Sequence, residues 1–177
     1  VAKLITSKTR AIIAVHLFGI PCEVNKLAQV AQEAKCMLIY DAAQGFGALV
    51  DGKPMGQFGD YVAFSFGRSK LFSIGEGGML VCRNRDLFER AVMISQHPIR
   101  MHRDIDDLTV RNSLDGIAMN FRMHPLVASL ASGQLSGLLK SSACEESRAI
   151  FEQVRDRLKS YQMESLLPDI PEDGTPS

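Results

Sequence analysis

Residues 11–41, with the sequence AIIAVHLFGIPCEVNKLAQVAQEAKCMLIYD, predict the architecture of the chain. Ala11–Val15 is a continuous apolar run of strand length, and Met37–Tyr40 is a second one. The segment between them carries apolar side chains at helical spacing, at Val24, Leu27, Ala28, Val30, Ala31 and Ala34. Alternation of strand, helix and strand is typical of a parallel sheet covered by helices, so we expect an α/β fold. Ligands of such sheets gather at the carboxyl ends of the strands.

The rest of the chain continues this pattern. Strands are expected at Tyr61–Phe66 and at Met79–Cys82. The glycine-rich turn Gly75–Gly78 is not followed by a helix, so it does not resemble a phosphate-binding loop. We expect it to bring backbone close beneath the preceding loop, because glycine has no Cβ. Helices are expected over three further segments, Asp86–Ser95, His124–Lys140 and Ala143–Met163.

Two of the expected strands end at residues that can carry chemistry. Asp41 closes the run Met37–Tyr40 and opens the turn Asp41-Ala42-Ala43-Gln44, and Lys70 follows the strand Tyr61–Phe66. An amine at a strand end can form a Schiff base, and a neighbouring carboxylate can keep a pyridine nitrogen protonated. Those are the groups that an enzyme using pyridoxal phosphate needs. The alternatives are a surface lysine that caps a loop and an aspartate that caps a helix or a turn.

Six short motifs occur along the chain in a fixed order, and each alone is weakly specific. They are Val15-His16-Leu17-Phe18-Gly19, Asp41-Ala42-Ala43-Gln44, Gly56-Gln57-Phe58-Gly59-Asp60, Phe64-Ser65-Phe66 with Lys70, Gly75-Glu76-Gly77-Gly78, and Asn120-Phe121-Arg122-Met123. In this order, and with this separation of Asp41 from Lys70, they resemble the DegT/StrS-type family. Its members are pyridoxal-phosphate-dependent aminotransferases of nucleotide-sugar biosynthesis with the aspartate-aminotransferase-like fold.

The resemblance implies an activity and two catalytic residues. The enzyme would transfer an amino group from glutamate or glutamine to the keto group of a nucleotide-linked sugar, with pyridoxal 5′-phosphate as cofactor. Lys70 would form the internal aldimine with the cofactor and then move a proton between the substrate and the cofactor. Asp41 would pair with the pyridine nitrogen.

The same resemblance assigns three further cofactor-binding residues. Gln44 would contact the cofactor ring or its phenolic oxygen, unless its amide only satisfies loop backbone. Ser65 would help to hold the cofactor phosphate, unless its hydroxyl bonds within its own sheet. Asn120 would reach the phosphate of a partner subunit, which implies a homodimer with composite sites.

The segment Gly67-Arg68-Ser69 departs from the family, which more often has His or Tyr, then Pro, then Thr or Ala before the lysine. Arg68 is therefore a candidate for contact with a phosphate or a substrate anion. The alternatives to an aminotransferase are a noncatalytic scaffold or regulatory subunit and a sugar dehydratase. In the dehydrating relatives a histidine replaces the lysine, so Lys70 argues against that reaction.

Composition excludes several classes of protein. The 177 residues include 20 basic and 20 acidic ones, so nothing in the charge favours nucleic acid or a membrane surface. The four cysteines are scattered without metal-ligand spacing and are typical of a reducing compartment. The longest apolar stretch, Ala11–Ile20, is far too short to span a membrane. We expect a soluble cytoplasmic protein.

The chain also has the features of a piece of a longer protein. It begins at Val1 without an initiator methionine, and the family's chains are about twice as long. We expect residues 1–142 to be part of the cofactor-binding large domain and residues 143–166 to be a connecting helix. Residues 167–177 are rich in Pro, Gly and acidic residues, which predicts a flexible tail that does not pack and leads to a missing small domain. An earlier segment with a phosphate-binding loop would be missing too.

Overall fold

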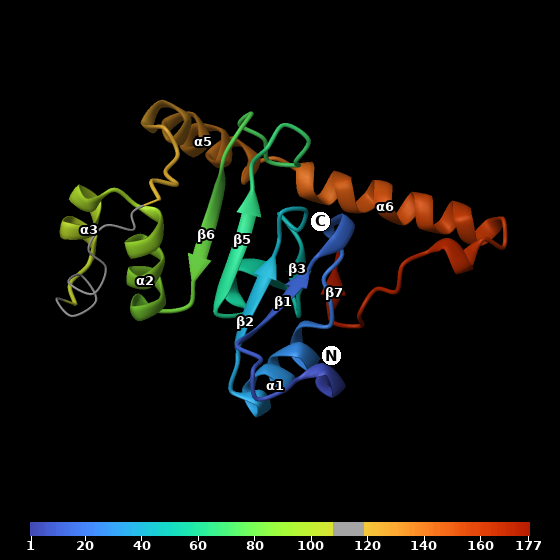
Figure 1. The fold of residues 1–177 in the computed structure, drawn as a ribbon. Coiled ribbons are helices and arrows are strands. Elements are labelled where there is room, and N and C mark those ends of the chain that lie inside the picture. The colour runs from blue at the N-terminus through green and yellow to red at the C-terminus, as the bar shows by residue number, and fades with distance from the viewer. Residues whose placement is uncertain (108–118) are drawn as a thin grey trace.

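The computed structural model describes residues 1–107 and 119–177 and contains a four-stranded sheet in the order β1-β2-β5-β6. The strands are β1 (Ala11–Val15), β2 (Met37–Asp41), β5 (Tyr61–Ser65) and β6 (Gly78–Cys82). The first three are parallel and β6 is antiparallel to β5, as the arrows in Figure 1 show. The expected α/β fold is confirmed, and the sheet is mixed.

The register of the parallel strands brings their carboxyl ends to one edge. Asp41 pairs with Val15 on one side and with Ala63 on the other. The backbone continues this alignment, because His16 N–H donates to the carbonyl of Asp41 at 3.0 Å and Ala42 N–H donates to Ala63 at 2.8 Å. Side chains that follow β1, β2 and β5 are therefore neighbours.

Helix α1 (Val24–Ala34) packs on the central strand β2. Tyr40 is fully buried, and its hydroxyl donates to the carbonyl of Val24 at 3.2 Å. The helix ends at Lys35, which adopts the left-handed conformation with φ 52°. A single core joins the helix to the sheet, made up of Ile12, Val24, Ala31, Leu38, Tyr40, Ala42, Ala48, Val50, Met55 and Val62.

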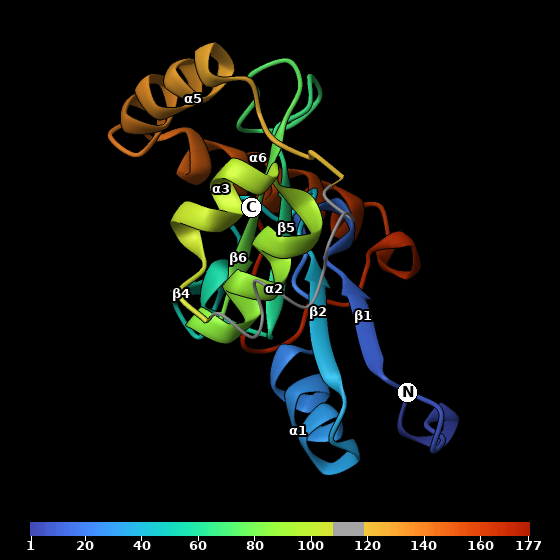
Figure 2. The ribbon, with the colours of Figure 1, turned by 60° about the vertical axis from the view of Figure 1, so that its left-hand side comes forward.

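The remaining helices lie around this core. Helix α2 (Arg85–Ser95) packs beside β6, and α3 (Pro98–Asp104) packs on α2, on the side away from β6 in Figure 1, with both helices turned toward the viewer in Figure 2. Helices α5 (Pro125–Leu138) and α6 (Ala143–Ser160) bury none of their residues and lie above the carboxyl ends of the parallel strands in Figure 1. Within the described ranges, none of the helices combines the length and the apolar character needed to cross a membrane.

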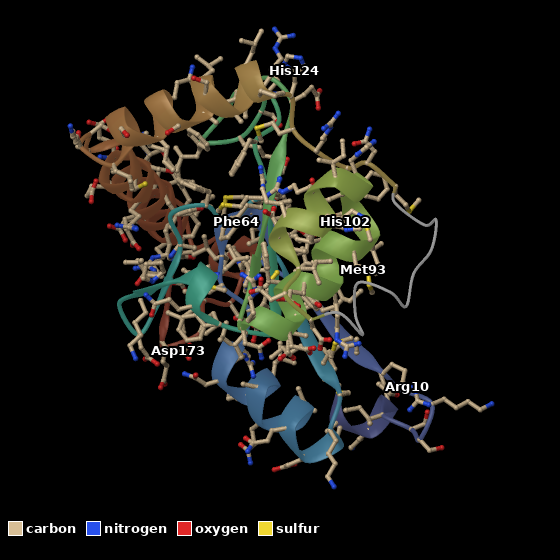
Figure 3. The ribbon with its side chains drawn as sticks, turned by 90° about the vertical axis from the view of Figure 1, so that its left-hand side faces the viewer. Arg10, Phe64, Met93, His102, His124 and Asp173 are labelled. Atoms are coloured by element: carbon tan, nitrogen blue, oxygen red, sulfur yellow. The ribbon has the colours of Figure 1, made fainter. Side chains whose placement is uncertain are left out.

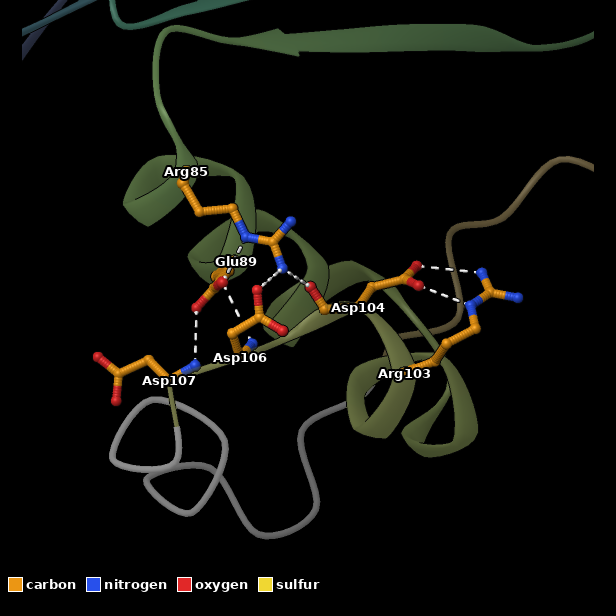
Figure 4. Close-up of polar contacts among 6 residues, drawn as sticks. All are labelled: Arg85, Glu89, Arg103, Asp104, Asp106 and Asp107. Carbon is orange, nitrogen blue, oxygen red and sulfur yellow. Dashed lines mark hydrogen bonds and ion pairs between the residues drawn. The ribbon is translucent and has the colours of Figure 1, made fainter.

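A buried carboxylate ties the segment after α3 to α2. Glu89 is only 3% exposed, and it accepts hydrogen bonds from Arg85 Nε at 2.5 Å and from the backbone N–H groups of Asp106 and Asp107 at 3.2 and 3.3 Å (Figure 4). The hydrogen bond from Arg85 holds the pKa of Glu89 below its ordinary value. These three donors replace the water that burial removes from the carboxylate.

The last residues of the chain pack, contrary to the sequence-based expectation for residues 167–177. A second sheet, in the order β4-β3-β7, joins β4 (Lys53–Pro54), β3 (Leu49–Val50) and β7 (Gly174–Thr175). Ser177 N–H donates to Gly19 at 3.1 Å, and Asp173 accepts a hydrogen bond from Asn25 of α1 at 2.7 Å, beside α1 in Figure 3. Backbone hydrogen bonds drive this packing, and composition does not reveal them. The proposed division into domains remains a prediction.

Helix boundaries differ by a few residues from the expected ones. The last expected helix, Ala143–Met163, ends at Ser160 because Gln162 turns the chain with φ 58°. Two long-range contacts then return the chain to the sheet: Arg148 of α6 donates through Nε to Pro176 at 3.0 Å and through Nη2 to Gly47 at 2.5 Å.

The turn before β5 provides a stability test with a matched control. Gly59 and Gly52 have nearly equal φ angles of +70° and +71°, but a Cβ on Gly59 would lie 2.7 Å from the ring of Tyr40, whereas a Cβ on Gly52 would meet nothing within 4 Å. Gly52→Ala should cost about 1 kcal/mol from backbone strain alone. Gly59→Ala should cost about 3 kcal/mol, because a clash in the core is added. Urea unfolding of the two variants measures this, and equal losses would contradict the packing described.

Candidate functional site

Two loops meet at the carboxyl edge of the sheet. One is the turn of residues 41–44 after β2, and the other is the loop of residues 66–77 after β5. Between them is a cavity of about 260 Å³, lined by Phe18, Ala43, Gln44, Phe46, Ser69, Lys70 and Leu71. The structure therefore brings Lys70 and Gln44 to one cavity, from strands that are not adjacent in the chain.

Asp41 shapes the first loop. It is the last residue of β2 and is half-buried, and its Oδ1 accepts a hydrogen bond from Ala43 N–H at 3.0 Å. No helix begins there, so of the two capping alternatives only the turn is present. The carboxylate lies outside the cavity lining described above, one turn away from Gln44.

Gln44 links the turn to the segment after β1. Its Oε1 accepts a hydrogen bond from Phe18 N–H at 2.6 Å, so the amide does satisfy loop backbone, as the alternative interpretation expects. Phe18 has φ 56° and ψ 25°, a left-handed conformation that residues other than glycine seldom adopt. The bond fixes the position of Phe18 at the rim of the cavity.

The loop that carries Lys70 is closed at its base. Phe66 N–H donates to Gly77 at 2.9 Å, and Ile74 N–H donates to Phe66 at 3.0 Å. A Cβ on Gly78 would lie 2.6 Å from the carbonyl oxygen of Phe64, so this glycine approaches the paired strand β5 rather than the loop that carries Lys70. Within the loop, Lys70 N–H donates to the carbonyl of Gly67 at 3.0 Å.

Ser65 ends β5 at the base of the same loop. Its hydroxyl accepts a hydrogen bond from Gly67 N–H at 3.3 Å. This contact is local and leaves the hydroxyl hydrogen free to donate, because the bond uses only a lone pair of the oxygen. The geometry thus allows both the structural role and a role in binding an anion.

Aromatic rings hold the two loops together. Phe46, which follows the first loop, stacks on Phe72 of the second with 5.4 Å between ring centroids. Phe72 in turn packs edge to face on Phe66 at 4.8 Å, and Phe64 meets Phe46 at 6.0 Å near the middle of the molecule in Figure 3. Aromatic pairs of this kind contribute about 1 kcal/mol each beyond the area they bury. They set the distance between the two loops and therefore the width of the cavity.

His16 lies beneath the site and is fully buried. Its Nδ1 accepts a hydrogen bond from Cys22 N–H at 3.1 Å, and its ring stacks on Tyr40 at 4.9 Å. Burial lowers the pKa of His16 to about 4, against the opposing effect of the Asp41 charge. The neutral ring carries its proton on Nε2, which has no hydrogen-bond partner. His16 therefore forms a hydrogen bond within the core through one ring nitrogen only.

Asn120 lies at a different cavity. It is exposed, has φ 57°, and lines a space of about 960 Å³ between β6, α2 and the start of α5. Within this chain Asn120 and Lys70 are therefore not brought together. In the described part of the chain, no group of three or more His, Cys, Asp or Glu side chains is placed to hold a metal ion.

Sequence reasoning missed three apolar residues of the Lys70 cavity, Phe18, Phe46 and Leu71. Phe46 has no signal beyond its apolar character. Phe18 belongs to a motif that the sequence singles out, but its backbone conformation is not readable from a phenylalanine.

Comparison with known proteins gives the family. The sequence model of the DegT/DnrJ/EryC1/StrS aminotransferase family matches residues 1–175. GDP-perosamine synthase of Escherichia coli O157:H7 is 35% identical over 131 residues, which are 74% of this chain and 34% of that protein. A dTDP-4-amino-4,6-dideoxy-D-glucose transaminase of Shigella dysenteriae is 38% identical over 51% of this chain and 24% of its own length.

A solved structure agrees over nearly the whole chain. DesV of S. venezuelae, determined in complex with a ketimine intermediate, superposes with a TM-score of 0.69 and 26% identity, covering 99% of this chain and 44% of that one. The chain thus spans less than half the length of each of these three proteins.

The buried histidine predicts a specific dependence of stability on pH. The pKa of His16 is about 4 in the folded protein and 6.5 as its ordinary value, so between these pH values the unfolded chain binds a proton that the folded one does not. The free energy of unfolding should therefore fall by about 3 kcal/mol as pH drops from 6.5 to 4, and be unaffected by this group above 6.5. In the His16→Gln variant, this contribution to the pH dependence of the free energy of unfolding should vanish. Parallel stability curves for the two proteins across this range would refute the assignment.

Proposed function

This chain belongs to the DegT/DnrJ/EryC1/StrS aminotransferase family, and on that premise we propose that the whole protein transfers an amino group from glutamate or glutamine to the keto group of a nucleotide-linked sugar. The observation that carries the proposal is the cavity in which the amine of Lys70 and the amide of Gln44 meet, beside the turn that Asp41 shapes. The names of the two relatives, a GDP-perosamine synthase and a dTDP-sugar transaminase, support a nucleotide-linked sugar as substrate.

The residues at this edge fit pyridoxal phosphate by their chemistry. The cofactor offers an aldehyde, a pyridine nitrogen, a phenolic oxygen and a phosphate. The chain offers a carboxylate at Asp41 and an amide at Gln44 where β2 ends, and a hydroxyl at Ser65 and an amine at Lys70 where the neighbouring strand β5 ends. When bound, the cofactor withdraws electrons from the bonds of the carbon that carries the amino group.

Each side chain then has a role that follows from its position. Lys70 would hold the cofactor through its amine, and once released Lys70 Nζ would carry a proton from the carbon of the amino donor to the cofactor. Asp41 keeps the ring nitrogen protonated through its charge. Gln44 is already fixed by its bond to Phe18 and orients the ring, and the Ser65 hydroxyl donates to the phosphate. Phe46 and Leu71 contribute apolar walls to the cavity that contains Lys70.

Two further parts of the proposal concern assembly and compartment. Asn120 lies away from Lys70 of the same chain, which suits a residue that completes the site of a partner subunit in a homodimer. All four cysteines, each within the described residues, have free thiols, which suits a reducing compartment such as the cytoplasm.

A labelling experiment tests the role of Lys70. In the full-length protein loaded with pyridoxal phosphate, borohydride reduction should leave the cofactor covalently attached to the peptide that contains Lys70, as peptide mapping by mass spectrometry would reveal. Lys70→Ala should lose the label and at least about a thousandfold in transfer rate, because it lacks the proton-moving amine. Lys53→Ala, on the exposed strand β4, is the matched control and should keep both. A label on any other lysine refutes the role of Lys70, and the absence of any label favours a noncatalytic scaffold.

Subunit exchange tests whether Lys70 of one subunit and Asn120 of the other form one site. Lys70→Ala and Asn120→Ala should each be inactive as full-length homodimers. After subunit exchange, a mixed dimer has one site in which both residues are intact, so an equal mixture should recover up to about a quarter of wild-type activity. Exchange is verified with two affinity tags. Mixed dimers that remain inactive would show that Asn120 does not act across the interface.

A further inference from the structure

Phe18 occupies an unfavourable position for a phenylalanine. Its backbone is left-handed, with φ 56°, yet its side chain is 74% exposed and lines the cavity that contains Lys70. Such strain costs free energy and persists only where the surroundings impose it, typically at functional sites. Burial within this chain does not offset the cost, because most of the ring faces solvent.

Three contacts impose the conformation on the backbone. Phe18 N–H donates to Gln44 Oε1 at 2.6 Å, and Ile20 N–H donates to Leu17 at 3.0 Å. The next residue, Gly19, also has positive φ, and its carbonyl accepts a hydrogen bond from Ser177 N–H at 3.1 Å. The turn is thus held from the Gln44 side and from the last residue of the chain. None of these contacts requires an aromatic side chain, so the ring itself is unexplained by the fold.

We propose that Phe18 is a substrate-recognition residue, whose ring forms the apolar wall against which the sugar of the nucleotide-linked substrate packs. This inference rests on the function proposed above. A hexose has faces made of C–H groups, and aromatic rings present the large, rigid apolar surface that such faces need. Ligand sites combine apolar walls of this kind with a few polar groups that orient the ligand, here Lys70 and Gln44.

The chemistry of the two substrates favours the sugar over the amino donor. Glutamate and glutamine carry a charged carboxylate and an amino group, which require hydrogen-bond donors and cations rather than an aromatic wall. The sugar in the name of the Shigella relative is a 4-amino-4,6-dideoxy sugar, whose carbon 6 is an apolar methyl group. A sugar of this class has more apolar surface to place against Phe18 than an ordinary hexose.

Three variants separate the effect of the aromatic ring on binding from the effect of backbone strain on stability. Phe18→Asn removes the ring but tolerates the left-handed backbone, Phe18→Tyr keeps the ring, and Leu17→Asn replaces an exposed apolar neighbour that does not line the cavity. Calorimetry on the full-length holoenzyme compares GDP-perosamine with GDP, and dTDP-4-amino-4,6-dideoxy-D-glucose with dTDP. The half-reaction with glutamate and the melting temperature are measured on the same proteins.

The expected result is a loss confined to the sugar. In the wild type, Phe18→Tyr and Leu17→Asn, at least one sugar nucleotide should bind more tightly than its nucleoside diphosphate. In Phe18→Asn that gain should shrink about tenfold, as the loss of one aromatic contact implies. Binding of the nucleoside diphosphate and the half-reaction with glutamate should not change, and the melting temperature should rise because the strain is relieved.

Other results would overturn the proposal in distinguishable ways. If the wild type distinguishes the sugar nucleotide and Phe18→Asn does so equally, the role of Phe18 fails and the proposed function stands. If Phe18→Asn loses sugar nucleotide, nucleoside diphosphate and glutamate reaction together and melts earlier, the ring packs against another part of the protein instead. If the wild type neither gains affinity from either sugar nor transfers amino groups, the proposed function fails and this inference fails with it.

Discussion

The pairing of β2 with a parallel strand on each side is the constraint on which the rest of the structure depends. Because Asp41 pairs with both Val15 and Ala63, backbone pairing fixes the ends of three strands at one edge of the sheet. Tyr40, one residue earlier, anchors the same strand to α1 through its buried hydroxyl. The backbone thus determines where the loops start, and the side chains of the loops determine only how they meet.

Two kinds of contact then bring the loops into a working arrangement. The rings of Phe46 and Phe72 join the turn after β2 to the loop after β5, and the amide of Gln44 joins that turn to Phe18 after β1. The turn after β2 therefore contacts the loop after β5 on one side and the segment after β1 on the other. The cavity that Lys70 lines results from these contacts, because residues of both loops are needed to form its walls.

The sequence predicts local elements and strand-end chemistry well, because apolar periodicity and the Asp41 turn are encoded by adjacent residues. It fails where distant residues decide the outcome. Gly174 and Thr175 belong to a strand only because Leu49 and Val50 offer free backbone groups, and the direction of β6 depends on how the loop of residues 66–77 closes. The left-handed Phe18 and the separation of Asn120 from Lys70 are also long-range results.

The closed base of the loop that carries Lys70 has a consequence for how such sites diversify. Backbone hydrogen bonds at Phe66 and Gly77 close the loop where it leaves the sheet, and the buried Phe72 packs it on Phe46, so the exposed residues near Lys70 can change in sequence without breaking either contact. The Gly67-Arg68-Ser69 segment, which departs from the pattern of the family, lies between these two hydrogen-bonded residues. Substitutions around the lysine can therefore accumulate during evolution while the sheet beneath keeps its structure.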